Sequence, residues 1–172
     1  WSSSTTTRTY SKPTNKKYQC VKSPTNAPCP LKSSDEEQTI KKIGNGTNDN
    51  NCVLYLREQR GIRLPSKNLS SFSSKVSIIN SHLPSTHSVA IIKTPGKNSG
   101  IGHLAEVVRF DTINGKAMML LYEANNPTRG YYERTITGDS LEEIQKNANI
   151  VGYYIEPDQI VEAQESYKSH LF

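Results

Sequence analysis

The chain has 172 residues and a formal net charge of +5, a length that suits about one ordinary domain with a short extension. Hydrophobic residues make up 34% of it, and no apolar run approaches the roughly 20 residues that a membrane-spanning helix needs. The sequence therefore excludes a membrane-spanning helix. It also excludes a coiled coil, because no heptad pattern persists, and a fully disordered chain.

The amino-terminal part differs sharply in composition from the rest. Residues 1–50 contain 10 hydrophobic residues and carry +4 of the net charge, whereas residues 51–172 contain 48 and carry only +1. We predict a flexible, basic linker rich in Ser, Thr, Lys and Pro over residues 1–33, a folded domain over 34–157, and a tail over 158–172 with helical spacing. A basic linker is most simply a solvated spacer, and it also suits contact with a polyanion such as a bacterial wall polymer, a membrane surface or a nucleic acid.

The three cysteines lie in two settings. Cys20 and Cys29 are close enough in sequence to close a small loop, which would leave Cys52 as an odd thiol. A disulfide between the first two would indicate an oxidising, exported location. The sequence leaves this pairing open.

The first helix signal is the capping box Ser34–Glu37, in which the first and last side chains can satisfy each other's backbone donors. Ile40 and Ile43 share a face after it, and Gly44 is a typical stop. This pattern predicts a helix that ends near residue 44.

A second helix is predicted from Cys52 to Arg60, with Asp49 or Asn50 as its cap and Gly61 as its stop. Cys52 then lies in the first turn, where backbone N–H groups and the helix dipole stabilise a thiolate. A thiolate is the attacking species in acyl transfer, although a buried structural cysteine is the simpler alternative for such a residue.

The pattern then changes to strands. Strands are predicted over Val89–Lys93, His103–Asp111, Lys116–Tyr122 and Val151–Ile155. Asn114-Gly115 predicts a tight hairpin between the middle two. A helix is expected over Leu141–Asn147, started by the box Ser140…Glu143. Helices followed by a largely antiparallel sheet define an α+β fold.

Two further positions could act with the thiol. His103 opens an apolar strand and could accept the thiol proton and later protonate a leaving amine, or it could be an ordinary surface histidine. Glu123 and Asn125 fall on one face of the neighbouring strand if that strand continues far enough. Either could accept the second N–H of the imidazole and orient the ring, or both could be a polar strand end before a turn.

Four segments, in this order, resemble the CHAP family of cysteine, histidine-dependent amidohydrolases/peptidases, which act on bacterial cell walls and occur in phage lysins. The segments are Asn51–Arg57 with its Cys-x-x-Tyr spacing, Gly102–Val108, Leu121–Asn125 and Gly152–Pro157. The resemblance covers roughly residues 34–157. It implies a papain-like α+β fold, with amino-terminal helices packed on a mainly antiparallel sheet.

The resemblance also implies roles for individual residues. Cys52 would be the nucleophile and His103 the general base, with Glu123 preferred as the orienting residue and Asn125 as a supporting polar residue. The backbone N–H of Cys52, aided by the side chain of Asn51, would form the oxyanion hole.

Two sites depart from the family pattern. Thr86-His87-Ser88 stands where members often have Gly-Asp, and we read His87 as a turn residue rather than a substrate contact. Some relatives bind calcium through clustered Asp residues, but Asn48-Asp49-Asn50 offers one carboxylate, so no metal or other cofactor is expected.

The function implied is a peptidoglycan hydrolase that cuts an amide bond: a muramoyl-alanine amidase, or an endopeptidase of the stem or cross-bridge. Such an endolysin-like enzyme would be secreted to a bacterial wall or borne by a phage, and would act as a monomer. The alternative is a non-catalytic wall-binding module. Nucleic-acid binding is not expected, because the domain itself carries a charge of only +1.

Overall fold

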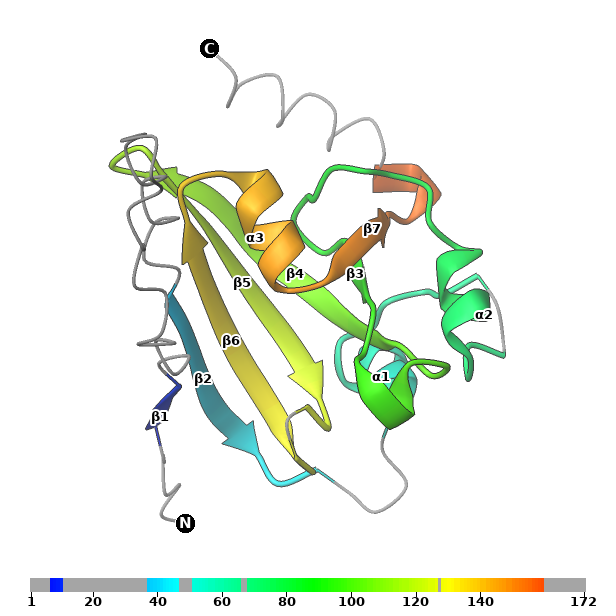
Figure 1. The fold of residues 1–172 in the computed structure, drawn as a ribbon. Coiled ribbons are helices and arrows are strands. Elements are labelled where there is room, and N and C mark those ends of the chain that lie inside the picture. The colour runs from blue at the N-terminus through cyan, green and yellow to red at the C-terminus, as the bar shows by residue number, and fades with distance from the viewer. Residues whose placement is uncertain (1–6, 11–36, 47–50, 66–67, 127, 160–172) are drawn as a thin grey trace, which may run out of the picture.

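The computed structural model of the chain describes residues 7–10, 37–46, 51–65, 68–126 and 128–159. Its centre is one seven-stranded sheet, in the order β1-β2-β6-β5-β4-β3-β7, with every neighbouring pair antiparallel (Figure 1). The strands are β1 (Thr7–Tyr10), β2 (Glu37–Gly44), β3 (Val89–Ile92), β4 (His103–Ile113), β5 (Lys116–Ala124), β6 (Tyr131–Gly138) and β7 (Ile150–Tyr154).

The helical segments are short and lie between strands. They are α1 (Cys52–Leu54), a π-helix (Tyr55–Gln59), α2 (Phe72–Val76), α3 (Leu141–Asn147), and 3₁₀ turns at Gly96–Asn98 and Pro157–Gln159. Among the described residues, no helix has the length and apolar character that crossing a membrane would require. An antiparallel sheet with a few helices is the α+β class that the sequence predicted.

The predicted strands and the α3 helix are confirmed to within a few residues. The hairpin between β4 and β5 turns at Asn114 and Gly115, whose φ angles of 53° and 76° are those of the predicted tight turn. Ser140 caps α3 through a hydrogen bond accepted from the Glu143 N–H at 3.1 Å.

The predicted helix that ends at Gly44 is wrong. Residues 37–44 instead form β2, which pairs with β6 in a register that places Ile40 opposite Arg134. The strand pairing outweighs the local helix signal because each residue gains ladder hydrogen bonds and cross-strand contacts that a short isolated helix would lack. The start of the predicted capping box, residues 34–36, lies outside the described residues.

The predicted linker over residues 1–33 is also wrong for Thr7–Tyr10, because these residues form β1 and pair with β2. The rest of that segment lies outside the described residues, as does 160–172, where the tail was expected to continue as a helix. Of the tail, 158–159 belong to the 3₁₀ turn Pro157–Gln159.

The sequence interpretation missed α2 and β6. In β6, every second residue from Tyr132 to Gly138 is buried, which is the burial pattern of a strand with one face on the core. The alternation was hard to recognise because one of its buried members is a charged residue, Arg134.

Two apolar clusters form the core. One contains Met119, Leu121, Ile136 and Ile144 and lies beneath α3. The other contains Tyr55, Leu56, Leu104 and Tyr154 and packs the helical segment that starts at Cys52. Because successive residues of a strand point to opposite faces, His103 and Ala105 of β4 share the face of the first cluster, with Leu104 on the second.

Candidate functional site

Cys52 is the first residue of α1, as the sequence predicted. The residue that caps the helix is Asn51, whose Oδ1 accepts a hydrogen bond from the Leu54 N–H at 2.9 Å. The predicted caps, Asp49 and Asn50, lie outside the described residues. The first N–H groups of a helix have no intrahelical acceptor, so Cys52 lies beside backbone donors that the helix itself does not use.

The helix does not continue as a regular α-helix to Arg60. From Tyr55 it becomes a π-helix, closed by a hydrogen bond from the Arg60 N–H to the Tyr55 carbonyl at 3.1 Å, and Gly61 ends it with a φ of 66°. Tyr55 stacks on Tyr131, with ring centroids 4.6 Å apart. The extra residue in the turn changes where the following side chains point, and Arg60 reaches the sheet.

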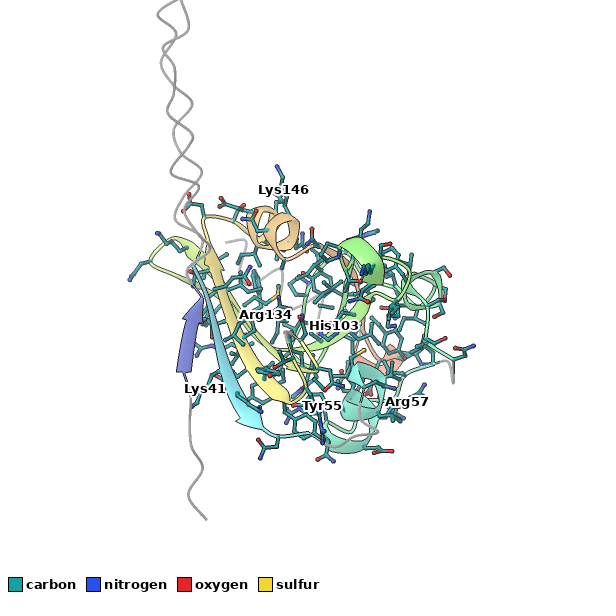
Figure 2. All side chains as sticks on the ribbon, turned by 60° about the horizontal axis from the view of Figure 1, so that its bottom comes forward. Lys41, Tyr55, Arg57, His103, Arg134 and Lys146 are labelled. Carbon is teal, nitrogen blue, oxygen red and sulfur yellow. The ribbon has the colours of Figure 1, made fainter. Side chains whose placement is uncertain are left out.

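Three charged side chains form a row across neighbouring strands on the sheet face nearest α3. His103 of β4 places Nε2 3.5 Å from Oε1 of Glu123 in β5, and Arg134 of β6 donates from Nε to Glu123 Oε2 at 2.9 Å. Their exposed fractions are 6%, 1% and 7% respectively, so all three are buried. Figure 2 shows the His103 and Arg134 side chains in the middle of the molecule.

Cys52 and His103 affect each other's protonation, because interaction with His103 favours the thiolate form of Cys52 and interaction with Cys52 favours the imidazolium form of His103. Burial favours the neutral thiol, but His103, the Leu104 backbone N–H and the charge of Lys75 together lower the pKa of Cys52 below its ordinary value of 9.0. Burial likewise lowers the pKa of His103, yet hydrogen bonds and charges from Cys52 and Glu123 raise it to about 9. Because Nε2 faces Glu123, Nδ1 is the ring nitrogen left for the thiol.

Glu123 is ionised at neutral pH despite complete burial. Burial raises the pKa of its carboxyl, but the charges of Arg134 and His103 and their hydrogen bonds bring it below the ordinary value of 4.5. Arg134 was not singled out in the sequence. The available signal was a basic residue on the buried side of a strand, which needs a buried partner of opposite charge.

Asn125 does not join this row. β5 ends at Ala124, and Asn125 follows in a left-handed conformation with a φ of 60°. Its side chain is exposed, and its Oδ1 accepts from the Gly130 N–H at 3.3 Å within the turn before β6. The expectation that Glu123 and Asn125 share a face is therefore wrong, because the strand ends before Asn125.

Asn51 lies beside the thiol in sequence, and its Oδ1 accepts as the helix cap, a contact that does not use its Nδ2 donor. Of the predicted oxyanion-hole donors, the backbone N–H of Cys52 is the one placed at the helix start.

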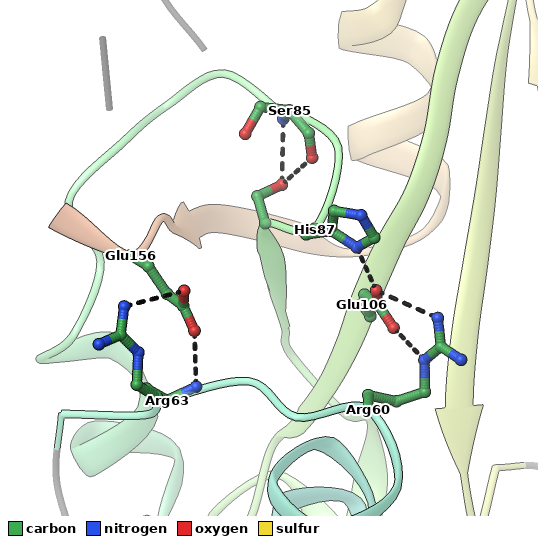
Figure 3. A network of polar contacts seen from close by, with 7 residues as sticks. Arg60, Arg63, Ser85, His87, Glu106 and Glu156 are labelled. Carbon is green, nitrogen blue, oxygen red and sulfur yellow. Dashed lines mark hydrogen bonds and ion pairs between the residues drawn. The ribbon is translucent and has the colours of Figure 1, made fainter. Parts of the chain in front are cut away.

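A second polar network lies on the other face of β4 (Figure 3). Glu106, which is fully buried, accepts from Arg60 Nε at 2.5 Å and lies 2.7 Å from Nδ1 of His87. The Arg60 guanidinium also lies over the Tyr122 ring, 4.7 Å from its centroid. His87 has a φ of 67° and is exposed, which fits the predicted turn residue. This network holds the segment after the π-helix on the sheet.

Within the described part of the chain, no group of three His, Cys, Asp or Glu residues is arranged to hold a metal ion. A separate surface pocket of about 370 Å³ is lined by residues that include Arg63, Tyr154 and Pro157 and by none of the row that contains His103. Cys20 and Cys29 lie outside the described residues.

No protein-family model, curated protein or solved structure matches this chain. The arrangement of Cys52, His103 and Glu123 is that of a nucleophile, a base and an orienting carboxylate, and it can support acyl transfer.

Proposed function

We propose that the protein is a cysteine amidohydrolase of papain-like fold that cuts an amide bond of bacterial peptidoglycan. The observation that carries the proposal is a thiol at a helix start, with its pKa lowered by a buried histidine that lies 3.5 Å from a buried, ionised glutamate. A module that only binds a polymer needs none of these three groups together. The choice of peptidoglycan rests on the four segments that resemble the CHAP family.

In the proposed reaction, the Cys52 thiolate attacks the carbonyl carbon of the amide and forms a tetrahedral oxyanion. The N–H of Cys52, at the helix start, is placed to donate to that oxygen. The oxyanion then collapses, the carbon–nitrogen bond breaks, and the His103 imidazolium gives its proton to the departing amine. A thioester remains on Cys52.

Water completes the cycle. The neutral His103 removes a proton from water, the hydroxide attacks the thioester, and the acid product leaves as the thiolate is restored. Glu123 orients the ring through Nε2 and stabilises its positive charge, while Arg134 keeps Glu123 ionised. Glu123 and Arg134 act through the histidine and are positioning residues.

An enzyme with this substrate works outside the cytoplasm, either secreted to the bacterial wall or delivered by a phage. The basic residues before position 33 would add attraction to anionic wall polymers. No cofactor enters the proposed reaction, and the protein would act as a monomer.

The test is digestion of purified peptidoglycan by the wild type and by Cys52→Ala, with the fragments identified by mass spectrometry. The proposal predicts new amine and carboxyl ends with the wild type only, and the bond that is cut identifies the enzyme as an amidase or endopeptidase. Cosedimentation of both proteins with peptidoglycan, with no cleavage by either, would instead favour a wall-binding module. Far-UV circular dichroism confirms that the variant is folded.

A further inference from the structure

We propose that Glu106 is a positioning residue of this site: through Arg60, its buried carboxylate holds the helical segment that carries Cys52 in place against β4. The inference rests on the proposed cysteine chemistry and concerns the face of β4 opposite to the row that contains His103. Glu106 lies three positions after His103, and Arg60 lies eight positions after Cys52. The pair therefore joins the two elements that carry the reacting groups.

The Glu106 carboxylate uses both of its oxygens (Figure 3). Oε2 accepts from Arg60 Nε at 2.5 Å, and Oε1 accepts from Arg60 Nη2 at 3.4 Å. Oε1 also lies 2.7 Å from Nδ1 of His87, in the turn before β3. The guanidinium lies over the ring of Tyr122, the residue that pairs with Glu106 in β5. Arg60 therefore has a fixed position and orientation on the sheet.

One continuous helical segment connects Arg60 to Cys52. At its start the Tyr55 N–H donates to the Asn51 carbonyl at 3.0 Å, and at its end the Arg60 N–H donates to the Tyr55 carbonyl at 3.1 Å. The second bond spans five residues rather than four, which is the π-helical register. An α-helical register would turn Arg60 by about 100° away from Glu106. The position of Arg60 on the sheet therefore fixes the rotation of the segment about its axis.

The other end of the segment packs directly against β4. Cys52 packs on the apolar cluster that contains Leu56 and Leu104, and Leu104 is the residue after His103. Apolar contacts have no preferred direction, so they bring the segment to the strand without fixing how it is turned. A guanidinium that binds a carboxylate through two nitrogens supplies the missing direction.

Stability alone does not explain a fully buried carboxylate at this position. Apolar residues of similar volume often replace a buried ion pair with no loss of stability, because burial of two charges is costly. What the pair supplies is geometry. A displacement of about 1 Å can lower the rate of a reaction about 100-fold, so this geometry matters most between a nucleophile and its base.

The experiment compares three variants so that positioning is separated from stability. Arg60→Met removes the pair but leaves the Glu106 carboxylate buried, whereas Arg60→Met/Glu106→Leu removes both charges. Arg63→Met is the matched control, because Arg63 lies three positions further along the chain and pairs with the exposed Asp158 at 2.8 Å.

Two measurements are made on each protein. Urea unfolding gives the free energy of unfolding. Alkylation of Cys52 by iodoacetamide as a function of pH reports how strongly His103 favours the thiolate, and peptide mass spectrometry separates Cys52 from Cys20 and Cys29.

We expect Arg60→Met to be less stable than the wild type and the double variant to regain most of that stability. At pH 6, Cys52 should nevertheless react about tenfold more slowly in both, because a rise of one unit in the thiol pKa lowers the thiolate fraction tenfold. At pH 10, where the thiol ionises in every protein, the rates should be similar. Arg63→Met should match the wild type at every pH.

The double variant decides the question even if Arg60→Met does not fold. A wild-type pH profile in the double variant would show that the pair only stabilises the fold and would overturn the proposal. An equal fall in rate at every pH would also overturn it, because that result indicates altered access to the thiol.

These outcomes do not depend on the substrate, because alkylation needs no peptidoglycan. If the profiles change as expected but the wild type does not cut peptidoglycan, the role of Glu106 stands and the proposed substrate is wrong. If the wild-type thiol titrates at its ordinary pKa, both the cysteine mechanism and the role of Glu106 are wrong.

Discussion

Replacing Arg134 by methionine tests whether Glu123 is a buried charge that depends on its partner. The two side chains are 7% and 1% exposed, and the Nε–Oε2 distance is 2.9 Å. With charge centres about 4 Å apart and an effective dielectric constant of about 20, their attraction is about 4 kcal/mol. Loss of one partner of a buried pair costs about 3–5 kcal/mol, because the other charge stays buried and uncompensated.

His103 remains 3.5 Å from the other carboxylate oxygen, so we expect the lower end of that range. Urea unfolding at pH 7 should show a loss of about 3 kcal/mol in the free energy of unfolding of Arg134→Met. In the wild type, Arg134 and His103 lower the pKa of Glu123 against burial, so the stability that this carboxyl contributes is present above pH 4.5 and lost as the pH falls. In Arg134→Met, the effect of burial on the pKa of Glu123 dominates, and the ionised carboxylate destabilises the folded state. The difference in the free energy of unfolding between the two proteins should therefore shrink as the pH falls towards 4.

The double variant Glu123→Gln/Arg134→Met should lose less stability than the sum of the two single variants, with a coupling of about 2 kcal/mol or more. Arg109→Met provides a control, because Arg109 pairs with Asp111 at 2.9 Å but is exposed, and its loss should cost under about 1 kcal/mol. A loss below about 1 kcal/mol for Arg134→Met at pH 7, or no coupling in the double variant, would refute the reasoning.

Three further predictions concern the residues around the thiol. Glu123→Gln should lower the rate of peptidoglycan cleavage at least about 100-fold by weakening the hold on the imidazolium, whereas Asn125→Ala should stay within about twofold; similar rates for the two would contradict the assignment of Glu123. Asn51→Ala should lower the free energy of unfolding by about 1 kcal/mol in urea titrations through loss of the cap, and an unchanged midpoint would argue against that cap. The pKa of His103 is raised from 6.5 to about 9, so the stability of the wild type relative to His103→Ala should be greatest below pH 6.5 and decline towards pH 9. A difference in the free energy of unfolding that stays constant with pH would exclude the raised pKa.

The sequence located the thiol and the histidine because local signals fix both positions. A run of turn formers before Cys52 and Gly61 after it mark the ends of a helical segment, and the Asn114-Gly115 hairpin sets β4 beside β5. Alternation along β5 then offered Glu123 and Asn125 equally. Only the point at which the strand ends separates them, and strand ends are set by tertiary contacts more than by local propensity.

The remaining parts of the site depend on contacts between distant segments. Arg134 is a charged residue that a local pattern places at the surface, and it is buried because Glu123, on the neighbouring strand, compensates its charge. Ile40 and Ile43 have spacing that suits a helix, yet their segment forms a strand because it pairs with β6. The π-helix after Leu54 could not be predicted either, since no local residue pattern distinguishes it from an α-helix.

The most direct test of the central claim is digestion of purified peptidoglycan in water enriched in ¹⁸O, with wild type and Cys52→Ala side by side. Hydrolysis of an amide through a thioester on Cys52 predicts one ¹⁸O atom in each newly formed carboxyl group, together with a new amine end, and neither product with Cys52→Ala. Equal release of fragments by the two proteins, or fragments that carry no new amine and carboxyl ends, would contradict the account.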